Sequence, residues 1–235
     1  GLGQFEINLM HVDDMLKAAD DAWLFKLLVR GLARKHGFAA SFMAKPYPDH
    51  SGNGMHMHFS VLDQDGNNIF DDGGPKGSER LHNAIAGCLN AMPGSMLILA
   101  PHANSYDRLV PGAHAPTKLC WGYENRTAAI RIPGGEPAAR RIEHRVSGAD
   151  ANPYLLLAAI LAAALDGIQN KMTSAAPVVG NAYEAELQQL PQDWAANIDV
   201  FEQNRFAGMH LATQCQTMFT SLKRQELQVF TKRMS

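Results

Sequence analysis

One stretch constrains the fold more than any other: an unbroken run of 12 apolar residues from Tyr154 to Leu165, which a charged residue ends. A helix that spans a bilayer needs about 20 apolar residues, so this run is too short for a membrane and predicts a buried core helix. Asn152-Pro153 precedes it, and proline is favoured at the first position of a helix. We therefore expect a helix over residues 153–173, the most hydrophobic of the chain.

The composition is that of an ordinary globular protein, with 46% apolar and 19% charged residues among 235. The 21 Lys and Arg against 23 Asp and Glu leave a net charge of −2, which excludes a strongly basic nucleic-acid binder. The three cysteines have no C-x-x-C spacing, as is typical of the reducing cytosol, and no signal segment opens the chain. These features predict a soluble cytoplasmic protein that binds neither nucleic acid nor a membrane.

The periodicity of the apolar residues predicts an α+β fold. Alternation predicts strands over residues 4–9, 54–62, 116–122, 126–132 and 141–146. Helical spacing predicts helices over 14–35, 78–91 and 153–173, and amphipathic helices from 181 onward, broken by Pro191 and Gly208. We expect residues 181–235 to be a helical extension of the same domain.

Two histidines on one predicted strand form the first candidate site. In segment 54–62, His56, His58 and Ser60 share one face, and apolar residues occupy the other. Because side chains alternate along a strand, both imidazoles point the same way, and neutral imidazole is a good ligand for Zn, Mn or Fe. A solvated polar face is the alternative interpretation. A cupin-like metal site is a third, which the helix content disfavours.

Arginines around a carboxylate form the second candidate site. Arg141, Glu143 and Arg145 share a face of a predicted strand, where two guanidiniums keep the carboxylate ionised, as a metal ligand must be. More arginines lie in predicted strands or turns, namely Arg108, Arg126 and Arg131. Together these groups predict a nucleoside triphosphate with a divalent metal, and a surface ion-pair ladder is the alternative. Neither a P-loop nor a Rossmann glycine motif occurs, so other groups must hold phosphate.

Taken together, five segments resemble the catalytic domain of the glutamine synthetase family. In chain order they are Gly3-Gln4-Phe5-Glu6; Phe42 to Pro46; Gly52 to His58; Asn104 to Gly112; and Asn125-Arg126-Thr127 through Arg131-Ile132-Pro133 to Arg141-Ile142-Glu143-His144-Arg145. The resemblance implies an antiparallel sheet that forms an active-site funnel with helices packed outside. It also implies an ATP-dependent ligase that joins the side-chain carboxylate of glutamate to an amine through γ-glutamyl phosphate, with ATP and Mg²⁺ or Mn²⁺ as cofactors.

The resemblance further implies a role for each matching residue. The metal ligands are Glu6, His56 and Glu143; the ATP contacts are His58, Ser60, Arg126, Arg131 and Arg141; the glutamate contacts are Gly52, Arg108 and Arg145; and the catalytic positions are Arg126 and His114. Phosphoryl transfer to a carboxylate brings anions together, so metals and arginines must neutralise charge as it shifts.

One loop departs from the ammonia-using members of the family, which carry a Glu after V-P-G. Here the loop reads Pro111-Gly112-Ala113-His114-Ala115-Pro116, and an imidazole lacks the fixed negative charge that holds a small cation. We therefore expect an acceptor larger than ammonia, as in the γ-glutamylpolyamine branch, which the segment from Trp121 to Arg126 also resembles. Two alternatives stay open: ammonia as the acceptor, and a degenerate, non-catalytic family member.

The resemblance begins within the family's metal site. The family's Glu-x-Glu carboxylates and its small N-terminal β domain lie upstream of the Gly-Gln-Phe-Glu motif, and that domain normally completes a neighbouring subunit's active site in ring-shaped oligomers. We therefore expect residues 1–235 to be a truncated catalytic domain that is inactive alone, from a protein that forms a homo-oligomer at full length.

Overall fold

The sheet has four short strands. The computed structural model describes residues 1 and 3–234, the last by its backbone alone, and its strands are β1 (Met57–Phe59), β2 (Trp121–Tyr123), β3 (Ile130–Ile132) and β4 (Ile142–His144). Their order across the sheet is β1-β4-β3-β2. β4 pairs antiparallel with both β1 and β3, as expected, whereas β2 and β3 run parallel. The sheet is therefore mixed, and each strand is shorter than the alternation predicts.

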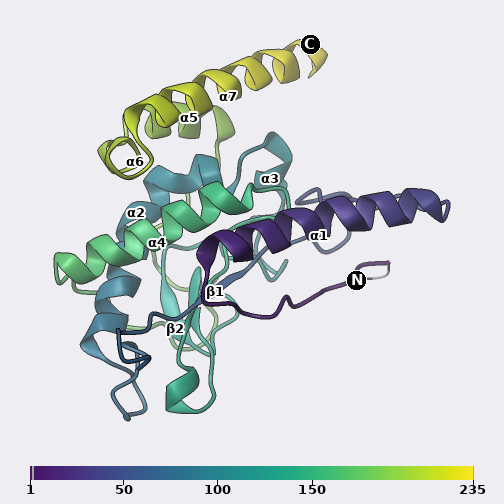
Figure 1. Ribbon diagram of the computed structural model, residues 1–235. Coiled ribbons are helices and arrows are strands. Elements are labelled where there is room, and N and C mark those ends of the chain that lie inside the picture. The colour runs from purple at the N-terminus through teal and green to yellow at the C-terminus, as the bar shows by residue number, and fades with distance from the viewer. Residues whose placement is uncertain (2, 235) are drawn as a thin grey trace.

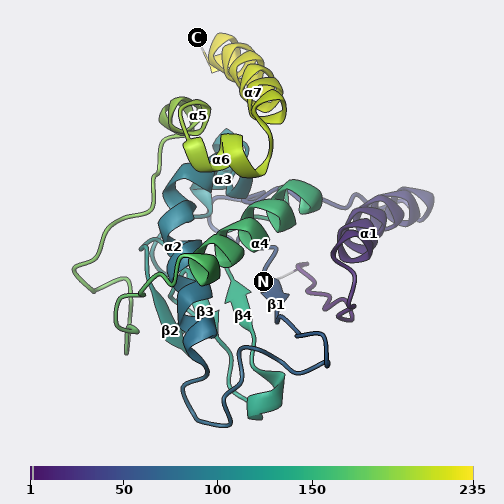
Figure 2. The same cartoon turned by 60° about the vertical axis from the view of Figure 1, so that its left-hand side comes forward.

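Two long helices cover one face of this sheet (Figures 1 and 2). α2 (Glu79–Leu99) and α4 (Pro153–Gln169) pack against each other and against the strands in the main hydrophobic core. α4 confirms the predicted core helix, although it ends before residue 173. α2 runs beyond its predicted end and through Pro93, because the residues on both sides of that proline contribute to the core.

Glycines let these two helices approach closely. A Cβ atom on Gly87 of α2 would lie 2.1 Å from the backbone oxygen of Ala163, and a Cβ atom on Gly167 of α4 would lie 2.1 Å from that of Asn83. Real Cβ atoms do not approach an oxygen so closely, so only glycine fits at these two positions without moving a helix.

α1 (Met15–Lys35) confirms the first predicted helix and lies beside α4, and Asp14 caps it by accepting hydrogen bonds from two backbone amides. The strand predicted over residues 4–9 is wrong, because this segment is a coil in which Phe5 is 89% exposed. No strand among the described residues pairs with it, and alternation without a neighbouring strand does not hold a strand together.

Three helices follow at the end of the molecule away from the sheet (Figure 1). α5 (Trp194–Glu202), α6 (Arg205–His210) and α7 (Thr213–Met234) confirm helices in the tail from residue 194 onward, whereas residues 181–193, also expected to be helical, are not. α5 packs on both α2 and α7. Gly208 lies inside α6 rather than at a break, and Ala212, with φ of 63°, separates α6 from α7. None of the helices in the described part of the chain has the length and apolar character needed to cross a membrane.

Two short elements border the sheet residues. α3 (Ala103–Asp107) comes directly before Arg108, and a 3-10 turn, η1 (Pro137–Ala139), lies between β3 and β4. Each therefore ends close to a predicted site residue, α3 before Arg108 and η1 before Arg141.

Candidate active site

The register of the sheet brings three predicted site residues into one row. His58 of β1 is opposite Glu143 of β4, and Glu143 is opposite Arg131 of β3. Directly opposed residues point their side chains to the same face of a sheet. The neighbouring His144 points to the other face, where it packs among residues of α2 and α4. Strand pairing alone therefore builds a polar row on the face away from these helices.

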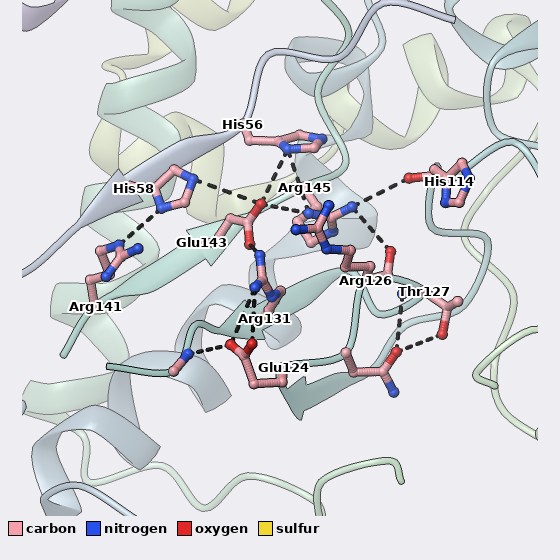
Figure 3. A network of polar contacts seen from close by, with 12 residues as sticks. His56, His58, His114, Glu124, Arg126, Thr127, Arg131, Arg141, Glu143 and Arg145 are labelled. Atoms are coloured by element: carbon pink, nitrogen blue, oxygen red, sulfur yellow. Dashed lines mark hydrogen bonds and ion pairs between the residues drawn. The ribbon is translucent and has the colours of Figure 1, made fainter. Parts of the chain in front are cut away.

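Glu143 is the centre of a network of polar contacts (Figure 3). Its Oε1 accepts a hydrogen bond from Arg145 Nη1 at 2.5 Å and lies 3.2 Å from His56 Nδ1 and 3.7 Å from His58 Nε2. Its Oε2 accepts from Arg131 Nη1 at 2.9 Å. The Glu143 side chain is 3% exposed. Predicted site residues from separate segments of the sequence thus meet at one buried carboxylate.

These surroundings fix the charge of the cluster. Burial by itself raises the pKa of a carboxyl, but the hydrogen bond with His56 and the positive charge of Arg145 outweigh it and lower the pKa of Glu143 to about 2. Burial lowers the pKa of His56 and His58, and nearby guanidiniums add to this effect. At neutral pH the cluster therefore holds an ionised carboxylate and neutral imidazoles among cationic arginines.

Arg145 joins this carboxylate to two loops. Its Nη2 donates to the backbone oxygen of Arg126 at 3.0 Å and to that of His114 at 3.4 Å. His114 has a φ of 55°, which is uncommon for a residue other than glycine. Both His114 and Arg126 are exposed. The two positions expected to be catalytic therefore lie on loops that meet at Arg145.

Arg108 lies beneath the glycine-rich turn that precedes β1. It is 3% exposed, and its guanidinium donates to the backbone oxygens of Val146 at 2.8 Å and Arg145 at 3.3 Å. A Cβ atom on Gly52 would lie 2.8 Å from Arg108 Cγ, so glycine lets the turn close over this side chain. Burial lowers the pKa of Arg108 to about 10. Gly52 and Arg108, both expected to bind glutamate, are thus in contact.

Sequence reasoning missed Glu124, which holds the other end of Arg131. Arg131 Nη2 donates to both carboxylate oxygens of Glu124, at 3.2 and 3.3 Å, while its Nη1 holds Glu143. Glu124 also accepts a hydrogen bond from the backbone N–H of Gly134, and this bond, with the positive charge of Arg131, lowers the pKa of Glu124. Glu124 follows the short strand β2 and belongs to no periodic pattern, so nothing in the sequence distinguishes it from a solvated carboxylate.

The remaining ATP contacts expected from the sequence lie at the β1 edge of the cluster. Arg141 Nε donates to His58 Nδ1 at 3.2 Å, so these two residues are in contact. Ser60 is exposed one residue beyond the end of β1. This edge therefore presents an imidazole, a guanidinium and a hydroxyl from neighbouring strands.

The expected metal ligands are brought together only in part. His56 and Glu143 meet, whereas Glu6 is exposed in the N-terminal coil. Gln4 in that coil donates to the backbone oxygen of Gly52 at 2.9 Å, so the coil passes beside the turn before β1. Among the described residues, no three His, Cys, Asp or Glu side chains are arranged to hold a metal by themselves. One carboxylate and one imidazole nevertheless fit a Mg²⁺ or Mn²⁺ ion that takes its other ligands from phosphates and water.

Several known proteins are similar to this chain in sequence. The family model described as "Glutamine synthetase, catalytic domain" matches residues 1–235. The chain is 43% identical over 230 residues to Gamma-glutamylputrescine synthetase PuuA of Escherichia coli (strain K12), a match that covers 98% of the chain and 49% of that protein. It is 39% identical over 234 residues to a glutamine synthetase of Methanocaldococcus jannaschii, covering 95% of the chain and 51% of that protein.

A solved structure is similar to this chain in fold. "GmaS/ADP complex-Conformation 1" superposes with a TM-score of 0.86 and 32% sequence identity, over 93% of this chain and 52% of that one. The chain thus spans about half the length of the curated relatives it matches. The family model covers the whole chain, and the relatives and the fold agree with it. This chain therefore belongs to the glutamine synthetase family and has the α+β fold of that family's catalytic domain.

Proposed function

We propose that this chain is the catalytic domain of an ATP-dependent carbon–nitrogen ligase, which joins the γ-carboxylate of glutamate to an amine through γ-glutamyl phosphate. The observation that carries the proposal is the buried carboxylate of Glu143, which lies between two imidazoles and two guanidiniums. Arginines bind phosphate and carboxylate oxygens bidentately, so such a cluster suits two anionic substrates. The match to the glutamine synthetase catalytic domain supports this function.

The arginines divide between the two substrates. The ATP contacts we propose are His58, Ser60, Arg126, Arg131 and Arg141, and the glutamate contacts are Gly52, Arg108 and Arg145. In the first step a γ-carboxylate oxygen of glutamate attacks the terminal phosphorus of ATP, and ADP leaves. The guanidiniums stabilise the charge on the transferring group. Because Glu143 already holds Arg131 and Arg145 in place, little rearrangement is needed when the charge develops.

A divalent metal would be held by His56 and Glu143, and a second one by Glu6 with ligands from elsewhere in the full-length protein. When bound, Mg²⁺ or Mn²⁺ supplies neutralisation of phosphate charge. The role of the surrounding residues is to keep Glu143 ionised and His56 neutral, which are the forms that bind a metal.

The acceptor that we propose is a primary amine larger than ammonia, such as a polyamine. Its nitrogen attacks the acyl carbon of γ-glutamyl phosphate, phosphate leaves, and the nitrogen loses a proton. His114 stands where ammonia-using members of the family carry Glu, so ammonium finds no fixed negative charge there. Similarity to Gamma-glutamylputrescine synthetase PuuA supports this acceptor. Similarity to a glutamine synthetase makes ammonia the second candidate.

We further propose that residues 1–235, with 181–235 as a helical extension, are part of a longer cytoplasmic protein that forms a homo-oligomer with shared active sites. The curated relatives are about twice as long as the matched region. α1 also presents large apolar side chains that are more than half exposed, namely Met15, Leu16, Leu24, Leu27 and Leu28. Further polypeptide would cover this face. A degenerate, non-catalytic protein is disfavoured, because it has no reason to keep the whole charged cluster.

Phosphate release by the full-length protein tests this function. We expect ATP turnover that requires both glutamate and an amine, measured with a panel of ammonium, a monoamine, an amino alcohol and a diamine. No glutamate-dependent phosphate release with any of these would contradict the ligase. Turnover of ammonium as fast as that of every larger amine would leave the ligase standing and contradict the proposed acceptor.

A further inference from the structure

Tyr183 lies between α4 and α5, outside the motifs considered above, yet its hydroxyl reaches the loop that carries His114. The Tyr183 O–H donates to the backbone oxygen of Ala115 at 2.9 Å. Ala115 is fully buried, whereas His114 before it is exposed. The hydrogen bond from Tyr183 therefore holds the loop at the point where it returns to the interior.

Arg145, which belongs to the cluster around Glu143, also holds the His114 loop. Arg145 Nη2 donates to the backbone oxygen of His114 at 3.4 Å. His114 has a φ of 55°, and a residue other than glycine keeps such a conformation when its surroundings enforce it. Hydrogen bonds to two consecutive carbonyl groups, from Arg145 and from Tyr183, enforce it here.

The segment that carries Tyr183 is fixed in turn to the loop of Arg126. The side chains on either side of Arg126 hold three backbone groups of this segment. The contacts are Asn125 Nδ2 to the oxygens of Val178 at 3.0 Å and Gly180 at 2.9 Å, and the Ala182 N–H to Thr127 Oγ1 at 2.9 Å. Tyr183 is thus a rigid support that links the Arg126 loop to the His114 loop.

The Tyr183 hydroxyl is a donor under ordinary conditions. Burial raises the pKa of Tyr183, although the positive charges of Arg145 and Arg108 oppose this.

We propose that Tyr183 is a positioning residue that sets amine selectivity by fixing the His114 loop. The inference rests on the proposed function, in which His114 faces the amine. Binding of an amine larger than ammonia depends on the shape of the loop, because the carbon chain of the amine must pack beside the acyl phosphate. Without the hydroxyl, the Ala115 oxygen loses its partner and the loop opens more often. Binding of the amine therefore suffers, while binding of ATP and glutamate does not.

Tyr183→Phe in the full-length protein tests this role, because it removes the hydroxyl and keeps the ring. We expect the KM for the amine to rise about three- to tenfold, as befits one lost hydrogen bond, with the KM values for ATP and glutamate unchanged. Hydrogen exchange of amides in residues 110–116 should accelerate by a similar factor. Tyr154→Phe is the matched control, because its hydroxyl bonds to Asp20 on α1, away from the loop. It should leave the amine KM and the loop exchange unchanged.

Two results would overturn the inference. Unchanged exchange in residues 110–116 would show that Tyr183 does not hold the loop, and faster exchange with an unchanged amine KM would show that the loop position does not govern selectivity. Failure of the wild-type protein to turn over any amine contradicts the proposed function, and the selectivity role with it. The exchange measurement still decides whether Tyr183 holds the loop, so the two failures are distinguishable.

Discussion

Arg145 and Glu143 form an ion pair with a distance of 2.5 Å between Nη1 and Oε1, although their side chains are only 5% and 3% exposed. A buried ion pair loses hydration, which is recovered only when both partners have further hydrogen bonds. Here Arg131 also binds the carboxylate, and backbone oxygens of two loops also accept from Arg145. The charges are therefore in place before any substrate arrives, as electrostatic catalysis of phosphoryl transfer requires.

Removing the charge of Glu143 should cost both stability and activity. Glu143→Gln leaves the buried Arg145 without its carboxylate and Arg131 with Glu124 alone, and breaking a buried pair in this way costs about 3 kcal/mol. Urea unfolding should show this loss in the free energy of unfolding, and glutamate-dependent ATP turnover should disappear. A variant within about 0.5 kcal/mol of the wild type, the usual range for surface substitutions, would contradict the role of Glu143 as the centre of the cluster.

Glu124 should tune ATP binding through Arg131. Glu124→Gln removes one of the two carboxylates that hold the guanidinium, so the KM for ATP should rise about three- to tenfold while the KM for the amine stays constant. Glu136→Gln is a matched control, because Glu136 is exposed on the loop after β3 and lines the same surface cleft as Glu124. An equal effect of both substitutions on the ATP KM would point to general charge loss and contradict the positioning role.

The contact between α2 and α4 should not tolerate a methyl group. In Gly167→Ala the new Cβ would lie 2.1 Å from the Asn83 oxygen, and overpacking of this kind costs about 1–3 kcal/mol of unfolding free energy. Gly31→Ala in the exposed part of α1 is the control, because nothing lies within 4 Å of its Cβ. Alanine favours helix by about 1 kcal/mol over glycine, so Gly31→Ala should stabilise the protein. Opposite signs in a thermal unfolding comparison are expected, and equal signs would contradict the close packing.

The buried His144 should make the fold sensitive to acid. Burial lowers its pKa to about 3, against an ordinary value of about 6.5. Between these values the unfolded chain binds a proton that the folded chain does not. The contribution of the neutral His144 to stability is therefore fully present above pH 6.5 and is lost progressively as the pH falls. From pH 6.5 to 5 the loss amounts to about 2 kcal/mol, a range in which Glu143 stays ionised in both states.

Denaturant unfolding of the wild type and of His144→Leu across this pH range measures that contribution. Leucine suits the apolar surroundings of His144, which include Met92, Leu99 and Ile160. The difference in unfolding free energy between the two proteins should shift by about 2 kcal/mol between pH 7 and pH 5 in favour of the variant. If the difference in unfolding free energy does not change with pH, His144 binds a proton as readily in the folded chain as in the unfolded chain, and the prediction is contradicted.

Much of the cluster follows from local patterns. Period-two alternation places His56 with His58, and Arg141 with Glu143 and Arg145, because side chains of a strand alternate whatever its partners are. The apolar run from 154 to 165 likewise predicts α4 from its own composition. These features need no knowledge of which strands pair, so the sequence suffices for them.

Other features depend on contacts between distant segments. Glu124 is distinctive only because β2 and β3 run parallel and bring it to Arg131 and Gly134. Tyr183 reaches Ala115 across 68 positions of sequence. The alternation at 4–9 predicts a strand wrongly, because a strand also needs a neighbour to pair with. Long-range pairing, which a single sequence does not display, decides all of these.

Competition between amines at the completed active site tests the central claim most directly. The full-length protein receives ATP, glutamate and equal concentrations of ammonium and a diamine, and mass spectrometry quantifies the two amide products. We predict that the γ-glutamyl diamine exceeds glutamine by about tenfold or more, equivalent to ~1.4 kcal/mol of discrimination, and that His114→Glu shifts the ratio towards glutamine. Glutamine as the main product of the wild type, with the same ratio in the variant, would contradict the claim that this loop selects an amine larger than ammonia.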